Sequence, residues 1–157
     1  AYDYEFWAKE VDGVTRAWCF PKELGIGTVV VRFATDGETE DGIPTEEKVA
    51  EVQAHIEENA PVPADITVVA PEAQVVNFTI GDLLPSNDTI KAQIQAELEA
   101  LLIREGAPGK ILYLSHIQQA ISSVEGEENH VLVSPTEDII CGNTKILVMG
   151  EVNYVET

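Results

Sequence analysis

The spacing of hydrophobic and polar positions predicts alternating helices and strands over the first half of the chain. Residues 2–10 are expected to form a short helix that Gly13 stops. The side chains of this helix that are expected to face inward are Tyr2, Phe6 and Trp7. Residues 14–20 are rich in strand-forming side chains up to Pro21. Residues 28–33, TVVVRF, form a nearly continuous apolar run, which is typical of a strand buried on both faces.

A second helix and a further strand complete this half. Thr45 is placed to cap a helix that runs to about Asn59, with acidic residues in its first turn where the helix dipole favours them. Pro61 and Pro63 are expected to end the helix, and residues 66–71 to form the next strand. The helix face and the strands are expected to share one core, which contains Trp18, Val30, Val49, Val52, Ile56 and Val68.

The second half opens near residue 73 and contains a long amphipathic helix. Ser86 or Asp88 is expected to cap a helix over 89–105, and Gly106 to end it in the left-handed conformation. One stripe of this helix is expected to pack on the sheet of the same half, and it carries Ile90, Ile94, Leu98, Leu101 and Leu102. The strands expected in this half lie at 75–80, 130–135, 139–140, 145–150 and 151–155.

A shorter helix follows the long one. The motif SHIQ predicts a capping box in which Ser115 is the N-cap and Gln118 reaches back to its backbone. The buried face of this helix is expected to carry Ile117, Ala120, Ile121 and Val124, before Gly126. The predicted fold class is α+β, with two small lobes of mixed sheet and helices packed on one face. The lobes are expected at 1–72, in the order α-β-β-α-β, and at 73–157.

Charge narrows the range of partners. The 157 residues carry a formal net charge of -19. A surface this acidic repels phosphate, so nucleic acid and anionic membranes are unfavourable partners. A basic protein surface, a bound cation or solubility alone accounts for the charge more readily. No apolar run approaches the ~20 residues of a membrane span, and no signal peptide is visible. The first residue is Ala1 and not Met, which fits a fragment of a longer protein, although removal of Met before Ala gives the same start.

The residue types that carry chemistry are scattered. Cys19 and Cys141 form no CxxC pair, and two buried thiols from a reducing compartment are expected. The histidines have no spacing that would place two imidazoles on one metal, and they are His55, His116 and His130. Ser115 adjoins His116, but no nucleophile-elbow motif surrounds it and the serine is explained as a cap.

Two loops remain to be interpreted. Gly25 and Gly27 in the run GIGT precede a strand and not a helix, so a tight turn explains them better than a phosphate-binding loop. The acidic loop at 36–41 carries carboxylates at alternating positions, which can hold calcium, although it lacks the twelve-residue calcium-loop pattern. A solvated acidic face is the simpler interpretation. The acidic residues of the loop are Asp36, Glu38, Glu40 and Asp41.

Short runs follow one another in a specific order along nearly the whole chain. The first set is Trp7, Ala8, Gly13, Val14, Arg16, Ala17, Trp18, Pro21, Gly25, Gly27, Thr28 and Val29. The second set is Val52, Gln53, Ile56, Pro61, Ala64, Val68, Ala70 and Pro71. The runs NFTIGDLLP, AELEALLIREG, SHIQQAISSVEGEENHVLVSP and MGEVNYV complete the series. Each run alone is weak evidence for a family. Their order along the chain resembles that of the baseplate J-like family of Mu-type and related phages.

The resemblance implies a structural component of a bacteriophage or prophage contractile-tail baseplate, which makes ring or wedge contacts. It implies no enzymatic activity, no catalytic, cofactor-binding or metal-binding residues, and no cofactor. The implied partners are other tail baseplate proteins and copies of the chain itself. The net charge, and not the resemblance, predicts no nucleic acid and no membrane as partners. The implied location is the virion tail baseplate, after synthesis in the bacterial host cytoplasm. The acidic run DGETEDG departs from the short connection expected at that point of the family.

The resemblance also implies a missing N-terminal part. Copies at -19 repel one another, and a fragment without one of its contact faces cannot close a ring, so a monomer or weak oligomer is expected alone. The surface expected to steer a basic partner is the acidic loop together with Glu46, Glu47, Glu57 and Glu58. Two alternatives stay open: a cation-dependent binding module that uses loop 36–41, and a small enzyme that uses scattered carboxylates.

Overall fold

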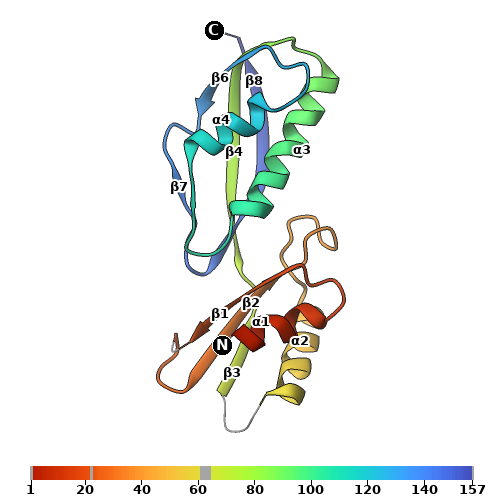
Figure 1. The fold of residues 1–157 in the computed structure, drawn as a ribbon, viewed down its shortest axis with the longest axis vertical. Helices are drawn as coiled ribbons and strands as arrows, with labels where there is room; N and C mark the ends of the chain where they lie inside the picture. Colours follow the sequence, from red (N-terminus) through yellow and green to blue (C-terminus); the bar gives the residue numbers. More distant parts are fainter. Residues whose placement is uncertain (1, 22, 61–64, 157) are drawn as a thin grey trace. The chain divides into compact units, whose positions relative to one another are not determined.

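The protein has an α+β fold, as predicted from its sequence. The structure is a computed structural model that describes residues 2–21, 23–60 and 65–156. The chain divides into two compact units, which are Ala1–Glu72 (unit 1) and Ala73–Thr157 (unit 2), and each combines helices with a small sheet (Figure 1).

Unit 1 is a three-stranded mixed sheet with two helices. Its elements are α1 (Tyr2–Glu10), β1 (Arg16–Pro21), β2 (Thr28–Ala34), α2 (Glu46–Asn59) and β3 (Asp65–Val69). The strands lie in the order β1-β2-β3, with β1 antiparallel and β3 parallel to β2. Each of these helices and strands was predicted from the sequence, with ends that differ by a few residues. The middle strand is buried on both faces from Val30 to Ala34, which confirms the inference from its apolar run.

Both helices pack on one face of this sheet. The core between the helices and the sheet contains Ala8, Val11, Ala17, Val31, Phe33, Val52, Ile56 and Val68, with Val49 packed at its edge. The predicted placement of Val49, Val52, Ile56 and Val68 in one core is confirmed. The predicted placement of Trp18 and Val30 in that same core is wrong. Side chains alternate along a strand, so Ala17 and Val31 face the helices while Trp18 and Val30 face the other way. Val30 is still buried, at 1% exposure.

The helix ends of unit 1 follow local sequence signals. The Thr45 side chain accepts a hydrogen bond from the Lys48 N–H at 3.2 Å, which confirms the predicted N-cap. The helix ends at Asn59 and Ala60 is extended, as expected for a residue before proline. Pro61 and Pro63 lie outside the described residues. In α1, Trp7 packs against the core, whereas Phe6 is 60% exposed and its predicted inward placement is wrong. The side chain of Tyr2 is outside the described part.

Unit 2 contains the longer strands and the longest helix. Its elements are β4 (Glu72–Leu84), α3 (Asp88–Glu105), β5 (Ile111–Leu112), α4 (Leu114–Ser122), β6 (Asn129–Ser134), β7 (Ile139–Ile140) and β8 (Lys145–Val155). One sheet has the order β6-β4-β8, and β5 pairs with β7 in a second, antiparallel sheet. The strand predicted at 75–80 is the middle of the longer β4. The strands predicted at 145–150 and 151–155 are a single strand, β8.

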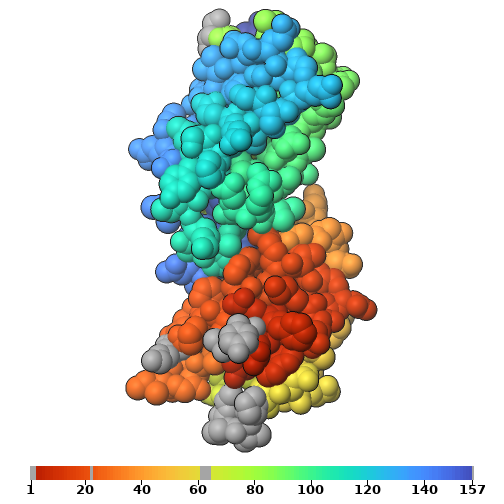
Figure 2. Space-filling view, viewed as in Figure 1, coloured from red at the N-terminus to blue at the C-terminus, as the bar shows by residue number. Residues whose placement is uncertain are grey.

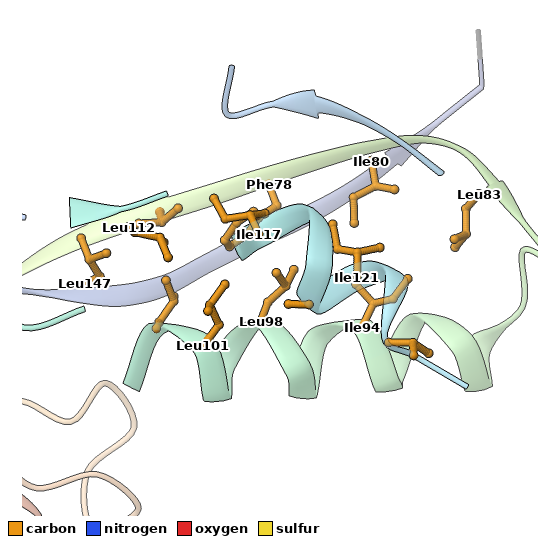
Figure 3. Packing of buried hydrophobic residues seen from close by; sticks show 14 of the residues in the cluster. Phe78, Ile80, Leu83, Ile94, Leu98, Leu101, Leu112, Ile117, Ile121 and Leu147 are labelled. Carbon is orange, nitrogen blue, oxygen red and sulfur yellow. The ribbon is translucent and has the colours of Figure 1, made fainter. Parts of the chain in front are cut away.

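The core of unit 2 lies between α3, α4 and the β6-β4-β8 sheet (Figure 3). The five predicted residues of the long helix are all buried: Ile90, Ile94, Leu98, Leu101 and Leu102. They meet Phe78 and Ile80 of β4, Leu147 of β8 and Ile117 and Ile121 of α4 in one cluster. The prediction that this helix packs on the sheet of its own half is therefore confirmed. Burial of five aliphatic side chains contributes on the order of 8–12 kcal/mol before the entropy of ordering is subtracted.

Three predicted helix ends in unit 2 differ from the structure. Asn87, and neither Ser86 nor Asp88, caps α3 by accepting from the Ile90 N–H at 2.9 Å. Gly106 has a φ of -94°, so it is not left-handed. A glycine is required there because an added Cβ would lie 2.3 Å from the Leu102 carbonyl oxygen and 2.8 Å from Leu147.

The capping box predicted at the start of α4 is also wrong. This helix begins at Leu114, and its N-cap residue Tyr113 makes no side-chain cap. The Leu114 N–H donates instead to Asp138 Oδ1 at 2.7 Å, from a residue 24 positions further along the chain. The Asp138 carboxylate therefore caps the N-terminus of α4, which is the role that was expected of Ser115. Among the described helices, none is long and apolar enough to cross a membrane.

Candidate functional site

Asp36, the first residue of the acidic loop, is held in an ion pair. Arg16 donates from Nε to Asp36 Oδ2 at 2.7 Å and from Nη2 to Oδ1 at 2.9 Å. Thr15 Oγ1 donates to the same Oδ2 at 2.6 Å. The Arg16 and Asp36 side chains are only 16% and 13% exposed, so water screens the pair poorly. Both carboxylate oxygens of Asp36 thus serve to join this loop to β1.

The rest of the acidic loop is closed by its own hydrogen bonds. The Thr35 N–H donates to the Gly42 carbonyl at 2.8 Å, and the Thr35 and Thr39 hydroxyls lie 3.0 Å apart. Asp41 Oδ1 accepts from the Ile43 N–H at 3.0 Å. The exposed acidic residues of the loop are Glu38, Glu40 and Asp41. Within residues 2–21, 23–60 and 65–156, no three His, Cys, Asp or Glu side chains are grouped to hold a metal ion. Nothing in this geometry supports the cation-binding alternative.

Each histidine lies beside a glutamate. The pairs are His55 with Glu10, His116 with Glu105 and His130 with Glu127. In the last pair both side chains are only 7% exposed, and Nδ1 of the histidine lies 2.7 Å from the carboxylate. Its Nε2 lies 2.7 Å from Gln118 Oε1, so the ring joins β6 to α4. These contacts give every imidazole a structural partner.

Neither cysteine is in a disulfide bond, and the two lie in different units. Cys19 is half-buried in β1, and this burial raises the pKa of its thiol. A raised pKa disfavours the thiolate, which is the nucleophilic form. Cys141 is buried, and its thiol donates to the Lys145 carbonyl at 3.2 Å. The expectation of two buried thiols is therefore confirmed for Cys141, whereas Cys19 is only partly buried.

The glycines of the run GIGT form a turn, as predicted. Gly25 and Gly27 have φ values of 122° and 85°, which favour glycine. The Gly25 carbonyl accepts from Thr28 Oγ1 at 2.7 Å, which fastens the turn to the start of β2. The segment leads into a strand and not into a helix, so no helix N-terminus is available there to receive a phosphate.

Sequence reasoning missed an arginine on the helix-free face of the unit 1 sheet. Arg32 is buried at 7% exposure and makes two hydrogen bonds to the Glu23 carboxylate, at 2.9 and 3.0 Å. These bonds lower the pKa of Glu23. The guanidinium also lies 4.9 Å from the centre of the Phe20 ring. A single arginine inside the apolar run TVVVRF was the signal for such a pair.

A hollow between α1 and α2 gathers part of the acidic charge. The acidic side chains that line it are Glu10, Asp12, Glu51 and Glu58, with His55 among them. The Lys48 ammonium lies nearby, 2.8 Å from the Asp12 carbonyl and 3.2 Å from Glu51. The four helix acids predicted to steer a partner are all exposed, and they are Glu46, Glu47, Glu57 and Glu58. The geometry brings carboxylates to one surface without the desolvation that acid–base catalysis needs.

Two family sequence models match the chain in order. The Baseplate J-like central domain matches residues 1–70, and the Baseplate J-like protein C-terminal domain matches residues 76–155. The chain therefore belongs to the Baseplate J-like family. This finding confirms the resemblance seen in the sequence.

Similar proteins come from phages and prophages. The Mu-like prophage FluMu protein gp47 of Haemophilus influenzae is 39% identical and matches 99% of this chain, but 46% of its own length. Putative protein JayE of Escherichia coli is 38% identical, over 97% of this chain and 57% of its own length. Baseplate protein gp47 of Escherichia phage Mu is 33% identical, over 98% of this chain and 45% of its own length. The chain thus spans about half the length of the relatives it matches.

Proposed function

We propose that the chain is part of a structural component of the contractile-tail baseplate of a phage or prophage. The observation that supports this most strongly is the consecutive match to the central and C-terminal Baseplate J-like domains over 1–70 and 76–155. A relative that matches almost the whole chain is named a baseplate protein of phage Mu. We also propose that the two units, 1–72 and 73–157, act as separate domains.

A role without catalysis is part of the proposal. The carboxylate, imidazole and thiol groups that were candidates for chemistry in the sequence take part in local structure. Asp36 pairs with Arg16, His130 joins Glu127 to Gln118, and the Cys19 thiol is held in its protonated form by burial. Side chains with such partners stabilise a scaffold, which is what a baseplate subunit has to supply. The small-enzyme alternative has no comparable observation in its favour.

The proposed partners are other tail proteins and copies of the same chain. The net charge of -19 favours basic protein surfaces and disfavours nucleic acid or anionic membranes. The exposed acids of α2 and the hollow between α1 and α2 form the steering surface in this proposal. Asp36 is removed from the predicted steering set because Arg16 neutralises it. The remaining loop acids stay in it.

The proposed location is the baseplate of the virion tail, after synthesis in the cytoplasm of the bacterial host. Alone, the chain is proposed to be a monomer or weak oligomer, because its copies repel one another at low salt. Disruption of the gene in its phage or prophage tests the function. Electron microscopy should then show no complete contractile tails, and a plasmid copy should restore them. Normal infectious particles without the gene would refute the proposal.

A further inference from the structure

β3 is an outer strand of the unit 1 sheet, so one side of its backbone forms an edge. In the described part of the chain the strand order is β1-β2-β3, and β3 pairs with β2 alone. The run ITVVA at 66–70 is rich in β-branched residues and carries no charge. An uncharged edge strand of this kind is prone to pair with a strand of another molecule unless something blocks it.

The Gln53 side chain of α2 occupies this edge. In the space-filling view, side chains of α1 in red and of α2 in yellow lie on the surface of unit 1 (Figure 2). Gln53 Oε1 accepts from the Val68 N–H at 2.7 Å, and Nε2 donates to the Ile66 carbonyl at 2.9 Å. These two backbone groups flank Thr67, whose own N–H and carbonyl face β2 because successive strand residues point their backbone groups to opposite sides. A fourth strand would bond to the same two groups, so the amide takes the place of one of its residues.

A third hydrogen bond fixes the orientation of this amide. Nε2 also donates to Glu57 Oε1 at 2.7 Å, so both hydrogens of the nitrogen are used. A rotated amide would place Oε1 against two acceptors and Nε2 against the N–H of Val68. The Gln53 amide therefore has one favourable orientation, and this orientation matches the donor and acceptor of the strand edge.

Side chains take outer backbone groups at two other places in the fold. On the opposite edge of the unit 1 sheet, the Cys19 N–H of β1 donates to Glu5 Oε2 of α1 at 3.3 Å. In unit 2, Gln74 Nε2 donates to the Ile140 carbonyl at 3.0 Å, and its Oε1 accepts from the Gly142 N–H at 3.0 Å. The Gln74 amide thus bonds to groups two residues apart, in the same pattern as Gln53. Both outer strands of the unit 1 sheet receive a helix side chain on their edge.

We infer that Gln53 blocks the edge of β3 against pairing with an extended segment of another polypeptide. Charged side chains and proline are common ways to protect an edge, but residues 66–70 contain neither. The amide supplies the protection instead, because it occupies the donor and the acceptor that an added strand needs. Its loss leaves the Val68 N–H and the Ile66 carbonyl available to such a strand. This inference concerns the edge of β3 alone, so it stands or fails separately from the proposed baseplate role.

Hydrogen exchange followed by NMR tests the contact in the 157-residue chain. In the Gln53→Ala variant, the Val68 N–H should exchange at least about 5-fold faster than in the parent, because its hydrogen bond is lost. The Thr67 N–H faces β2 and should change less. The matched control is Gln95→Ala on α3. Gln95 makes the same kind of contact to a glutamate four residues later, from Nε2 to Glu99 Oε1 at 3.2 Å.

Thioflavin T fluorescence tests the blocking of strand pairing, because it reports the formation of fibres built from added strands. The control here is Ile56→Val, which lowers the stability of unit 1 in the same helix without removing an edge contact. The variants are compared at temperatures that give equal folded fractions. Gln53→Ala should then form fibres at least about 3-fold sooner than Ile56→Val, since only its edge is open.

Faster exchange of the Val68 N–H together with earlier fibres in Gln53→Ala would support the inference. Unchanged protection of that N–H would overturn it, because the amide would then not hold the edge in solution. Fibres that form no sooner than in Ile56→Val would also overturn it, since Gln53 would then only join α2 to β3. Should Gln53→Ala fail to fold, Gln53→Met gives the same two readouts, because methionine keeps the length and helix propensity of glutamine without its hydrogen bonds.

Discussion

The Val52→Asp substitution tests the core of unit 1. Val52 is completely buried in the middle of α2, against a cluster that includes Val31, Phe33 and Val68. The change removes the apolar burial of the valine side chain, which contributes about 1.5–3 kcal/mol, and places a carboxyl group among apolar side chains. The expected loss of unfolding free energy is therefore about 3–5 kcal/mol.

Tryptophan fluorescence isolates this effect. Trp7 and Trp18, the two tryptophans of the chain, both lie in unit 1, so their emission in a urea titration reports the unfolding of that unit. For about 70 residues, a loss of 3 kcal/mol lowers the melting temperature by roughly 12–24 °C. Far-UV circular dichroism in the same titration follows both units.

The matched control is Ala54→Asp, which adds the same charge to the same helix at an exposed position. It should cost about 1 kcal/mol, from helix propensity and from repulsion by Glu51 and Glu58, which line the same hollow. A Val52→Asp variant that melts within about two degrees of the parent would show that this helix face is not in the core. Equal losses in the two variants would show that charge, and not burial, is responsible.

The remaining predictions concern the distant helix cap, the pH dependence and the acidic loop. Asp138→Ala should lower the free energy of unfolding of unit 2 by about 1 kcal/mol, measured by urea titrations followed by circular dichroism, because it removes the carboxylate that caps α4. Ser115→Ala should change this free energy by less than about 0.3 kcal/mol, and a larger loss for Ser115→Ala than for Asp138→Ala would instead support the local capping box. The pKa of Glu23 is lowered on folding, so its stabilising contribution is complete above the ordinary glutamate pKa of about 4.3 and is lost as the pH falls through the lower folded pKa. The stability difference between parent and Glu23→Gln, expected at about 1 kcal/mol or less, should thus begin to shrink as the pH falls below about 4.3 and vanish once the pH is below the folded pKa. A difference that stays constant down to pH 2 would contradict the ion pair. Millimolar calcium should leave the melting temperature unchanged, because Arg16 occupies Asp36; a rise that Asp36→Ala abolishes would support the cation-binding alternative.

Patterns within one element were predicted well from the sequence. The stripe of α3 is buried from Ile90 to Leu102, and Thr45 caps α2, because helical periodicity and capping depend on neighbours within a few residues. The orientation of β1 and β2 was not predictable in the same way. Both strands carry large apolar side chains on both faces, so alternation alone did not decide whether Ala17 or Trp18 faces the helices.

Interactions between distant residues account for two further errors, at the start of α4 and in the acidic loop. The carboxylate that caps α4 comes from Asp138, which is far from Leu114 in sequence, so the local SHIQ motif was misleading. The pairing of Asp36 with Arg16 depends on β1 and β2 lying side by side, and the acidic loop looked unoccupied until that was known. The functional conclusion came from the order of motifs along the chain. The chemistry of individual side chains did not provide it, since an assembly surface needs no distinctive reactive group.

Immunogold electron microscopy of purified particles tests the central claim most directly. Antibodies raised against the 157-residue chain are applied to particles from the phage or induced prophage that encodes it, with particles from a strain lacking the gene as the control. A structural baseplate component should be labelled at the end of the tail distal to the head, and only when the gene is present. Particles that carry normal tails but show no label, with mass spectrometry finding none of its peptides, would contradict the account.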